Sequence, residues 1–131
     1  MSNIVKMRVQ THPYTGQRYE LICDYQKQSF SYKDEQSTEE RYVKMNDQQI
    51  SQFTDILERV KQLRPRDYKG PITNNGMYWE FDLVNNRNKM VEIEGINMID
   101  TEVIMILRDL EEIINKPLGV SQFSMSELYD S

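Results

Sequence analysis

The chain has 131 residues and a mass of 15.7 kDa, the size of one domain that can bury a core without disulfides or a metal. Its 21 acidic and 16 basic residues give a formal net charge of −5, so net charge provides no nonspecific attraction to nucleic acid or anionic lipid. A single cysteine, Cys23, excludes an internal disulfide, and a single histidine, His12, excludes a metal site built from several histidines.

The sequence carries no recognisable membrane or secretion signal. No apolar run approaches the roughly 18 residues of a membrane span, and residues 1–6 lack the apolar core of a signal peptide. We therefore expect a cytoplasmic protein that does not associate with membranes.

The first third of the chain has the pattern of a strand meander. Residues 4–10 alternate between apolar and polar side chains, which predicts a strand, and residues 11–17 have the composition of a turn. Residues 19–25 alternate again and form the second predicted strand. Aromatic alternation indicates a third strand around residues 30–32. After a polar loop, residues 41–45 return briefly to extended structure.

A strong helix signal follows the meander. Asn46 is a typical N-cap, and Gln49, three residues later, completes the capping-box pattern. The apolar stripe that begins there predicts a helix over residues 47–63, which Pro65 ends. The next residues form a connector rich in proline and glycine.

The second half of the chain predicts a hairpin and another helix. Residues 77–84 show the clearest alternation in the sequence, and residues 89–95 form a partner strand. Asp100 is a suitable N-cap for a helix over residues 101–114. Residues 103–107 are five consecutive apolar residues, more than a helix with one buried face needs. This helix is therefore either central to the core or in contact with another chain.

The order strands, helix, hairpin, helix predicts an α+β fold with a mainly antiparallel sheet and both helices packed on one face. We expect a single domain over residues 1–116 and a flexible C-terminal tail over residues 117–131.

The most informative pattern is the register that the hairpin requires. Its apolar residues share one face only if three cross-strand pairs form: Leu83–Val91, Phe81–Ile93 and Trp79–Gly95. This register implies a loop of odd length at residues 86–88, in which an asparagine takes the left-handed conformation. The opposite face then carries four carboxylates as two directly opposed pairs: Asp82–Glu92 and Glu80–Glu94.

Three interpretations of these carboxylates are open. In the first, Lys6 and Arg8 on an adjacent strand neutralise them, or they point into water, and their role is structural. In the second, they dock a basic surface of a partner. In the third, they hold a divalent cation, for which carboxylate oxygens are suitable ligands, although no loop motif accompanies them.

Three other residue patterns are candidate sites. The connector places Arg66 and Tyr68 close together, a combination that suits either contact with phosphate or a nucleotide base or a solvated linker. His12 has no orienting partner in the sequence and is expected to be a turn residue instead of a catalytic base. Cys23 is in phase with apolar neighbours, which predicts a small core residue.

We expect a noncatalytic binding or regulatory protein that acts through contact with another protein. In its sharpest form, it is an acidic inhibitor that covers a basic surface of a nucleic-acid-binding target. Its expected partner-binding residues are Glu80, Asp82, Glu92, Glu94, Arg66 and Tyr68. No catalytic residue, metal ligand or cofactor is assigned, and direct nucleic-acid binding is not expected.

Two alternatives come from different classes of protein. One is a small carboxylate-dependent hydrolase or nucleotide-acting enzyme that uses Asp24 together with the hairpin carboxylates. The other is a structural homo-oligomer, such as a homodimer, held together through residues 103–107.

Overall fold

The computed structural model describes residues 3–36, 41–63, 76–96 and 101–120. In chain order the elements are β1 (Ile4–Pro13), β2 (Tyr19–Asp24), β3 (Ser29–Asp34), β4 (Tyr42–Lys44), α1 (Asp47–Lys61), β5 (Met77–Asn85), β6 (Met90–Ile96) and α2 (Thr101–Ile114).

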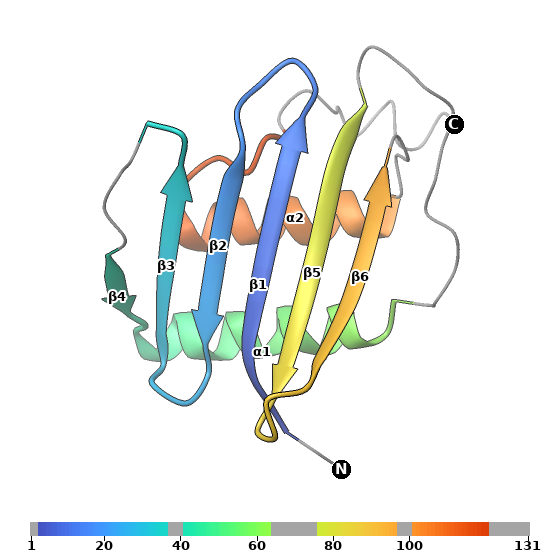
Figure 1. Ribbon diagram of the computed structural model, residues 1–131. Helices are drawn as coiled ribbons and strands as arrows, with labels where there is room; N and C mark the ends of the chain where they lie inside the picture. The colour runs from blue at the N-terminus through green and yellow to red at the C-terminus, as the bar shows by residue number, and fades with distance from the viewer. Residues whose placement is uncertain (1–2, 37–40, 64–75, 97–100, 121–131) are drawn as a thin grey trace.

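The strands form one antiparallel sheet in the order β4-β3-β2-β1-β5-β6, and both helices lie on the same face of it (Figure 1). The first four strands follow one another as a meander, and β5 then pairs with the free side of β1. The predicted α+β fold, with a mainly antiparallel sheet and two helices on one face, is confirmed. Neither described helix combines the length and apolar character that crossing a membrane requires.

The central strand β1 is longer than the sequence pattern predicts. Residues 11–13, expected in a turn, continue the pairing with β5 as far as Pro13–Met77. The pairing with β5 also shifts between Ile4 and Lys6. Next to this shift, Ile4 packs against the core.

The β5–β6 hairpin has the register that the apolar pattern predicts. Trp79 pairs with Gly95, Phe81 with Ile93 and Leu83 with Val91. The turn follows Asn85, whose backbone N–H donates to the Lys89 carbonyl at 2.9 Å. Asn88 adopts a φ of 60°, the left-handed conformation expected for an asparagine in this loop. The outer face of the hairpin is therefore the predicted one.

The first helix begins with the predicted capping box. The Asn46 side chain accepts a hydrogen bond from the Gln49 backbone N–H at 2.7 Å, and the Gln49 side chain accepts one from the Asn46 N–H at 3.0 Å. The second helix spans the predicted residues 101–114. Its expected cap, Asp100, lies outside the described residues.

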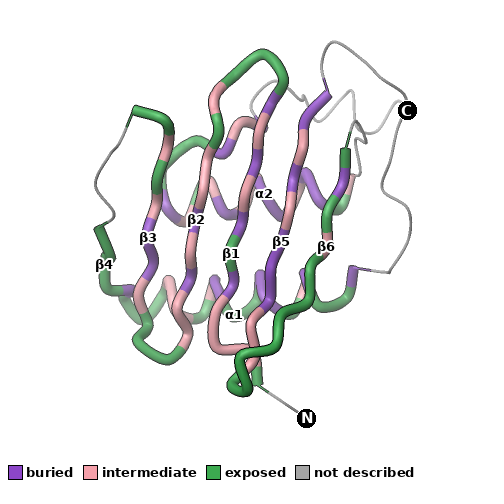
Figure 2. The backbone as a smooth tube through the Cα atoms, viewed as in Figure 1, coloured by how far each residue is buried: buried purple, intermediate pink, exposed green. Residues whose placement is uncertain are grey.

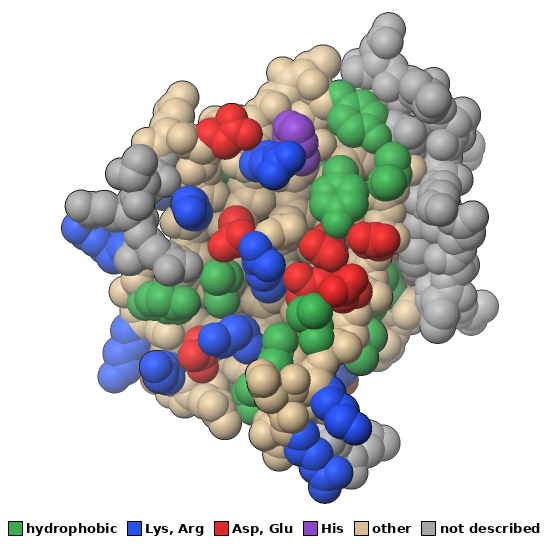
Figure 3. All heavy atoms as spheres, viewed as in Figure 1, with side chains coloured by type: hydrophobic (Ala, Val, Ile, Leu, Met, Phe, Trp, Pro, Cys, Tyr) green, Lys and Arg blue, Asp and Glu red, His purple; other side chains and the backbone are tan. Residues whose placement is uncertain are grey.

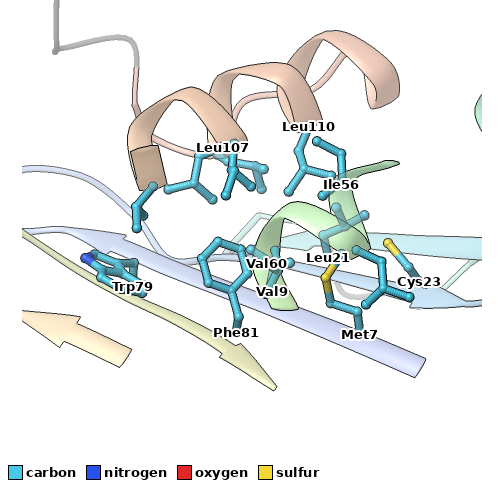
Figure 4. Packing of buried hydrophobic residues seen from close by; sticks show 14 of the residues in the cluster. Met7, Val9, Leu21, Cys23, Ile56, Val60, Trp79, Phe81, Leu107 and Leu110 are labelled. Atoms are coloured by element: carbon cyan, nitrogen blue, oxygen red, sulfur yellow. The ribbon is translucent and has the colours of Figure 1, made fainter. Parts of the chain in front are cut away.

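The core lies between the sheet and the two helices (Figure 4). Trp79 and Phe81 of β5 and Met7 and Val9 of β1 face the helix residues Ile56 and Leu107, and all of these are buried. Four of the five residues in the apolar run of α2 are also buried: Val103, Ile104, Ile106 and Leu107. The run is therefore accounted for by the core, and it does not require contact with a second chain.

The beginning of the expected C-terminal tail belongs to the core. Leu118 and Val120 are both fully buried. Thr11 on β1 donates a hydrogen bond to the Leu118 carbonyl at 2.7 Å, and the Tyr32 hydroxyl donates one to the Pro117 carbonyl at 2.8 Å. The packed part of the chain thus extends at least four residues past the expected boundary at 116/117. Residues 121–131 lie outside the described residues.

Candidate functional site

The candidate site lies on the face of the sheet opposite the helices. No described helix or strand covers this face (Figure 2). Because successive side chains of a strand point to opposite faces of the sheet, every second residue of these strands lies on it. On β5 and β6 these outward residues include four acids, which we call the acidic patch: Glu80, Asp82, Glu92 and Glu94. Figure 3 shows acidic side chains gathered on this face with hydrophobic ones above and below them.

The strand register brings the four acids together as predicted. Glu80 lies directly opposite Glu94, and Asp82 lies opposite Glu92. Carboxylate oxygens of Glu80, Glu92 and Glu94 all lie within 4.8 Å of one another. The Tyr78 hydroxyl donates a hydrogen bond to Glu94 at 3.1 Å. Three of the four acids therefore converge on one point.

Asp82 is the most buried member of the patch. The residue is 4 % exposed, and among the described residues no donor hydrogen-bonds to its Oδ1. Burial raises the pKa of Asp82 to about 6, and the negative charges of Glu80 and Glu92 contribute to the rise, which Arg8 opposes. Asp82 thus forms the floor of the patch, and the more exposed glutamates form its rim.

The basic residues expected to neutralise the patch lie close to it but have other neighbours. Arg8 is opposite Asp82 on β1, yet its guanidinium donates to Glu20 on β2, with Nη2 2.8 Å from Oε2. Lys6 is opposite Val84 and therefore beyond the acids. Within the described chain, no ion pair joins a patch acid to a basic side chain.

Arg8 instead forms an ion pair with Glu20 within the sheet. Burial opposes ionisation of Glu20, but hydrogen bonds from Arg8 and Gln10 outweigh it and lower the pKa of this carboxyl. The hydrogen bond to Glu20 likewise raises the pKa of Arg8, and the more distant charges of Asp82 and Glu80 add to that effect. Neutralisation of the patch by Arg8 is therefore only partial.

Apolar side chains flank the patch at both ends. The cross-strand pair Tyr78–Ile96 lies beyond Glu80 and Glu94, and the pair Val84–Met90 lies beyond Asp82 and Glu92. Ile96 is 38 % exposed and Met90 is 53 % exposed. The alternating pattern of the strands predicts that these residues share the outer face. How far each of them is exposed to solvent could be learned only from the structure.

A pocket of about 510 Å³ lies beside the patch, between the outer sides of β1, β2 and β3. Its charged lining contains three cations and three acids besides His12: Arg8, Arg18, Lys33, Glu20, Asp34 and Glu35. Because basic and acidic side chains are equal in number, the charge of the lining favours neither a cationic nor an anionic ligand. His12 lines the pocket from the end of β1, where it pairs with Tyr78, so it is a strand residue and not the expected turn residue.

The structure separates the remaining candidate residues from the patch. The Asp24 carboxylate accepts hydrogen bonds from the backbone N–H groups of Gln26 and Lys27, which makes it a turn residue at the end of β2. Cys23 is fully buried, as predicted, and burial raises the pKa of its thiol. Arg66 and Tyr68 lie outside the described residues.

The sequence matches no protein-family model and no curated protein with which it was compared.

We predict that neutralising the rim of the patch does not destabilise the free protein. The variant Glu80→Gln/Glu94→Gln removes one directly opposed pair of like charges while keeping side-chain size and a hydrogen-bond acceptor for Tyr78. Its free energy of unfolding should rise by a few tenths of a kcal/mol, roughly the size of exposed cross-strand charge effects. Urea unfolding at low ionic strength measures the change. A loss of about 1 kcal/mol or more would mean that the acids are neutralised internally.

Proposed function

We propose that the protein is a noncatalytic binding protein that docks a basic surface of a protein partner on the acidic patch. The observation that carries this proposal is the convergence of three glutamates, with Asp82 on the same strands, on a sheet face that no described helix or strand covers, without an ion pair to any described basic side chain. Such a surface holds negative charge that a cationic partner can neutralise.

The chemistry of the partner follows from the surroundings of the patch. Lysine or arginine side chains would meet the carboxylates, and opposite charge would accelerate and orient the encounter. The apolar pairs at the two ends of the patch suit apolar or aromatic anchors on either side of the basic group. The ring of Tyr78, held by its hydrogen bond to Glu94, offers a further face to a guanidinium.

This combination favours a folded protein or a peptide segment that alternates basic and apolar residues. An acidic protein that covers such a surface competes with polyanions for it. We therefore propose, as the finer form of the function, inhibition of a partner whose basic surface otherwise contacts nucleic acid.

The test compares three forms of the protein as bait in one extract of the native cell. They are the wild type, Glu80→Gln/Glu94→Gln, and the matched control Glu102→Gln/Glu112→Gln, whose acids are exposed on α2 on the other side of the molecule. We expect a basic protein that the wild type and the control retain and the patch variant loses. With the purified pair, association should slow about tenfold for the patch variant and lose most of its salt dependence.

Two outcomes would contradict the proposal. A partner that the patch variant binds as fast as the wild type must use another surface. Equal losses in the patch variant and in the α2 control would show that net charge, and not the location of the acids, governs binding.

A further inference from the structure

We propose that the edge of β6 binds an extended segment of the basic partner, which adds to the six-stranded sheet as a further, antiparallel strand. This inference rests on the proposed docking function and names the form that the partner takes beside the acidic patch. In the bound segment, basic side chains alternate with apolar ones.

The first observation is the position of β6 at an edge of the sheet (Figure 1). Among the described strands, β6 pairs only with β5. Its seven residues also make it longer than β4, the three-residue strand at the opposite edge. An edge strand presents backbone N–H and C=O groups to which an extended chain can bind, and a longer edge presents more of them.

The hydrogen-bond pattern of the hairpin shows which backbone groups of β6 face away from β5. The N–H of Asn85 donates to the carbonyl of Lys89, so these two residues form a hydrogen-bonded pair. Such pairs alternate with non-bonded pairs along an antiparallel ladder, so the odd-numbered residues of β6 bond to β5. The backbone groups of the other four residues point away from β5: Met90, Glu92, Glu94 and Ile96.

The side chains of β6 define the chemistry of a strand that fits beside it. Glu92 and Glu94 are exposed on the outer face of the sheet. On the opposite face Val91 is 59 % exposed and Ile93 is half-buried, so the core covers neither completely. Because directly opposed side chains of an antiparallel pair share a face, an added strand would place basic residues opposite the glutamates. Apolar residues between them would lie opposite Val91 and Ile93.

A second copy of the chain fits this edge poorly. If two β6 strands pair antiparallel over all seven residues, with their outer faces on the same side, Glu92 lies opposite a glutamate of the second copy. A shift by two residues in either direction leaves five pairs and places Glu92 or Glu94 opposite its own counterpart. Like charges directly opposite each other destabilise a strand pair, so the glutamates disfavour self-pairing and favour a basic strand.

The experiment titrates the full-length protein into a fluorescent seven-residue peptide in which lysine and valine alternate, with lysine at both ends. Fluorescence anisotropy records binding in about 0.05 M salt, where exposed charges are screened less than at physiological ionic strength. We expect saturable binding of one peptide per chain with a dissociation constant below about 1 mM.

Methylation of the peptide's backbone nitrogens tests whether the peptide binds as a strand. In an antiparallel strand beside β6, the lysines lie opposite Glu92 and Glu94 and direct their N–H groups toward β6, whereas the valines direct theirs away. Methylation of two lysine nitrogens should therefore weaken binding at least about tenfold. Methylation of two valine nitrogens keeps the charge, the length and the number of methyl groups, and should change binding less than about threefold.

A protein variant separates strand addition from attraction by charge alone. Val91→Asp adds a negative charge on the face where the peptide's valines would lie. Strand addition predicts binding at least about fivefold weaker, because the new carboxylate meets apolar side chains. Attraction by charge alone predicts equal or tighter binding. Val91 is 59 % exposed, so the variant should fold, which its urea unfolding curve verifies.

Two further variants locate the peptide on β6. Glu92→Gln/Glu94→Gln should weaken binding at least about tenfold, whereas the control Glu102→Gln/Glu112→Gln on α2 should bind as the wild type does.

Three outcomes would overturn strand addition. They are absence of peptide binding up to about 1 mM, equal binding of the two methylated peptides, and binding that Val91→Asp leaves unchanged or strengthens. None of them refutes docking, which the capture experiment with Glu80→Gln/Glu94→Gln tests separately. A captured partner that does not depend on the acidic patch would refute docking, whatever the peptides show.

Discussion

Trp79→Ala is expected to lower the free energy of unfolding by about 3–5 kcal/mol, the range for truncating a large aromatic residue in a core. The side chain is 1 % exposed, and its ring centroid lies 5.7 Å from that of Phe81. Truncation removes these contacts and leaves a cavity between β5 and the helices that the surrounding residues can fill only in part.

Urea unfolding followed by circular dichroism measures this loss. Tyr42→Ala is a suitable control, because Tyr42 is also an aromatic strand residue but is 49 % exposed, and it should cost less than about 1 kcal/mol. A similarly small cost for Trp79→Ala would contradict the packing described for the core.

Gly95→Ala is expected to cost about 3 kcal/mol, the upper end of the range for overpacking. Gly95 of β6 lies directly opposite Trp79 of β5, and the indole covers it. A Cβ atom at this position would lie 2.6 Å from the indole Nε1, a separation that real Cβ atoms do not tolerate. Either the indole or the strand must move, and both are fixed by the surrounding core.

A double-mutant cycle separates this clash from an intrinsic need for glycine. In the Trp79→Ala background the indole is absent, so alanine at position 95 should cost much less than in the wild type. We expect a coupling free energy of about 2 kcal/mol from the four unfolding curves. Equal costs in the two backgrounds would instead assign the effect of Gly95→Ala to the backbone of β6.

The hairpin shows how much of the fold the sequence could predict. Apolar and charged residues alternate so clearly in β5 that only one register places Trp79, Phe81 and Leu83 on the same face as the apolar residues of β6, and that register also places Glu80 opposite Glu94. The capping box of α1 was predictable for a similar reason, since Asn46 and Gln49 interact over a single turn of chain. Local patterns decided both features.

The features that the sequence could not predict depend on contacts between distant segments. Thr11 and its neighbours continue β1 because β5 is there to pair with them. Leu118 is buried against the sheet, where its carbonyl accepts a hydrogen bond from the Thr11 hydroxyl, although no periodic pattern in the sequence marks it. Arg8 could have paired with either adjacent strand, and only the side-chain geometry shows that it binds Glu20 and leaves Asp82 buried without it.

The position of β1 has a consequence for synthesis of the chain. The strand lies in the middle of the sheet, but its pairing with β5 closes a loop of about sixty residues between Pro13 and Met77. On the ribosome, the meander and α1 emerge first, while one edge of β1 still lacks its partner. At a few residues per second or faster, that edge stays open for seconds and offers a template for intermolecular pairing. We therefore expect this protein to depend on chaperones during translation more than a helical protein of equal length.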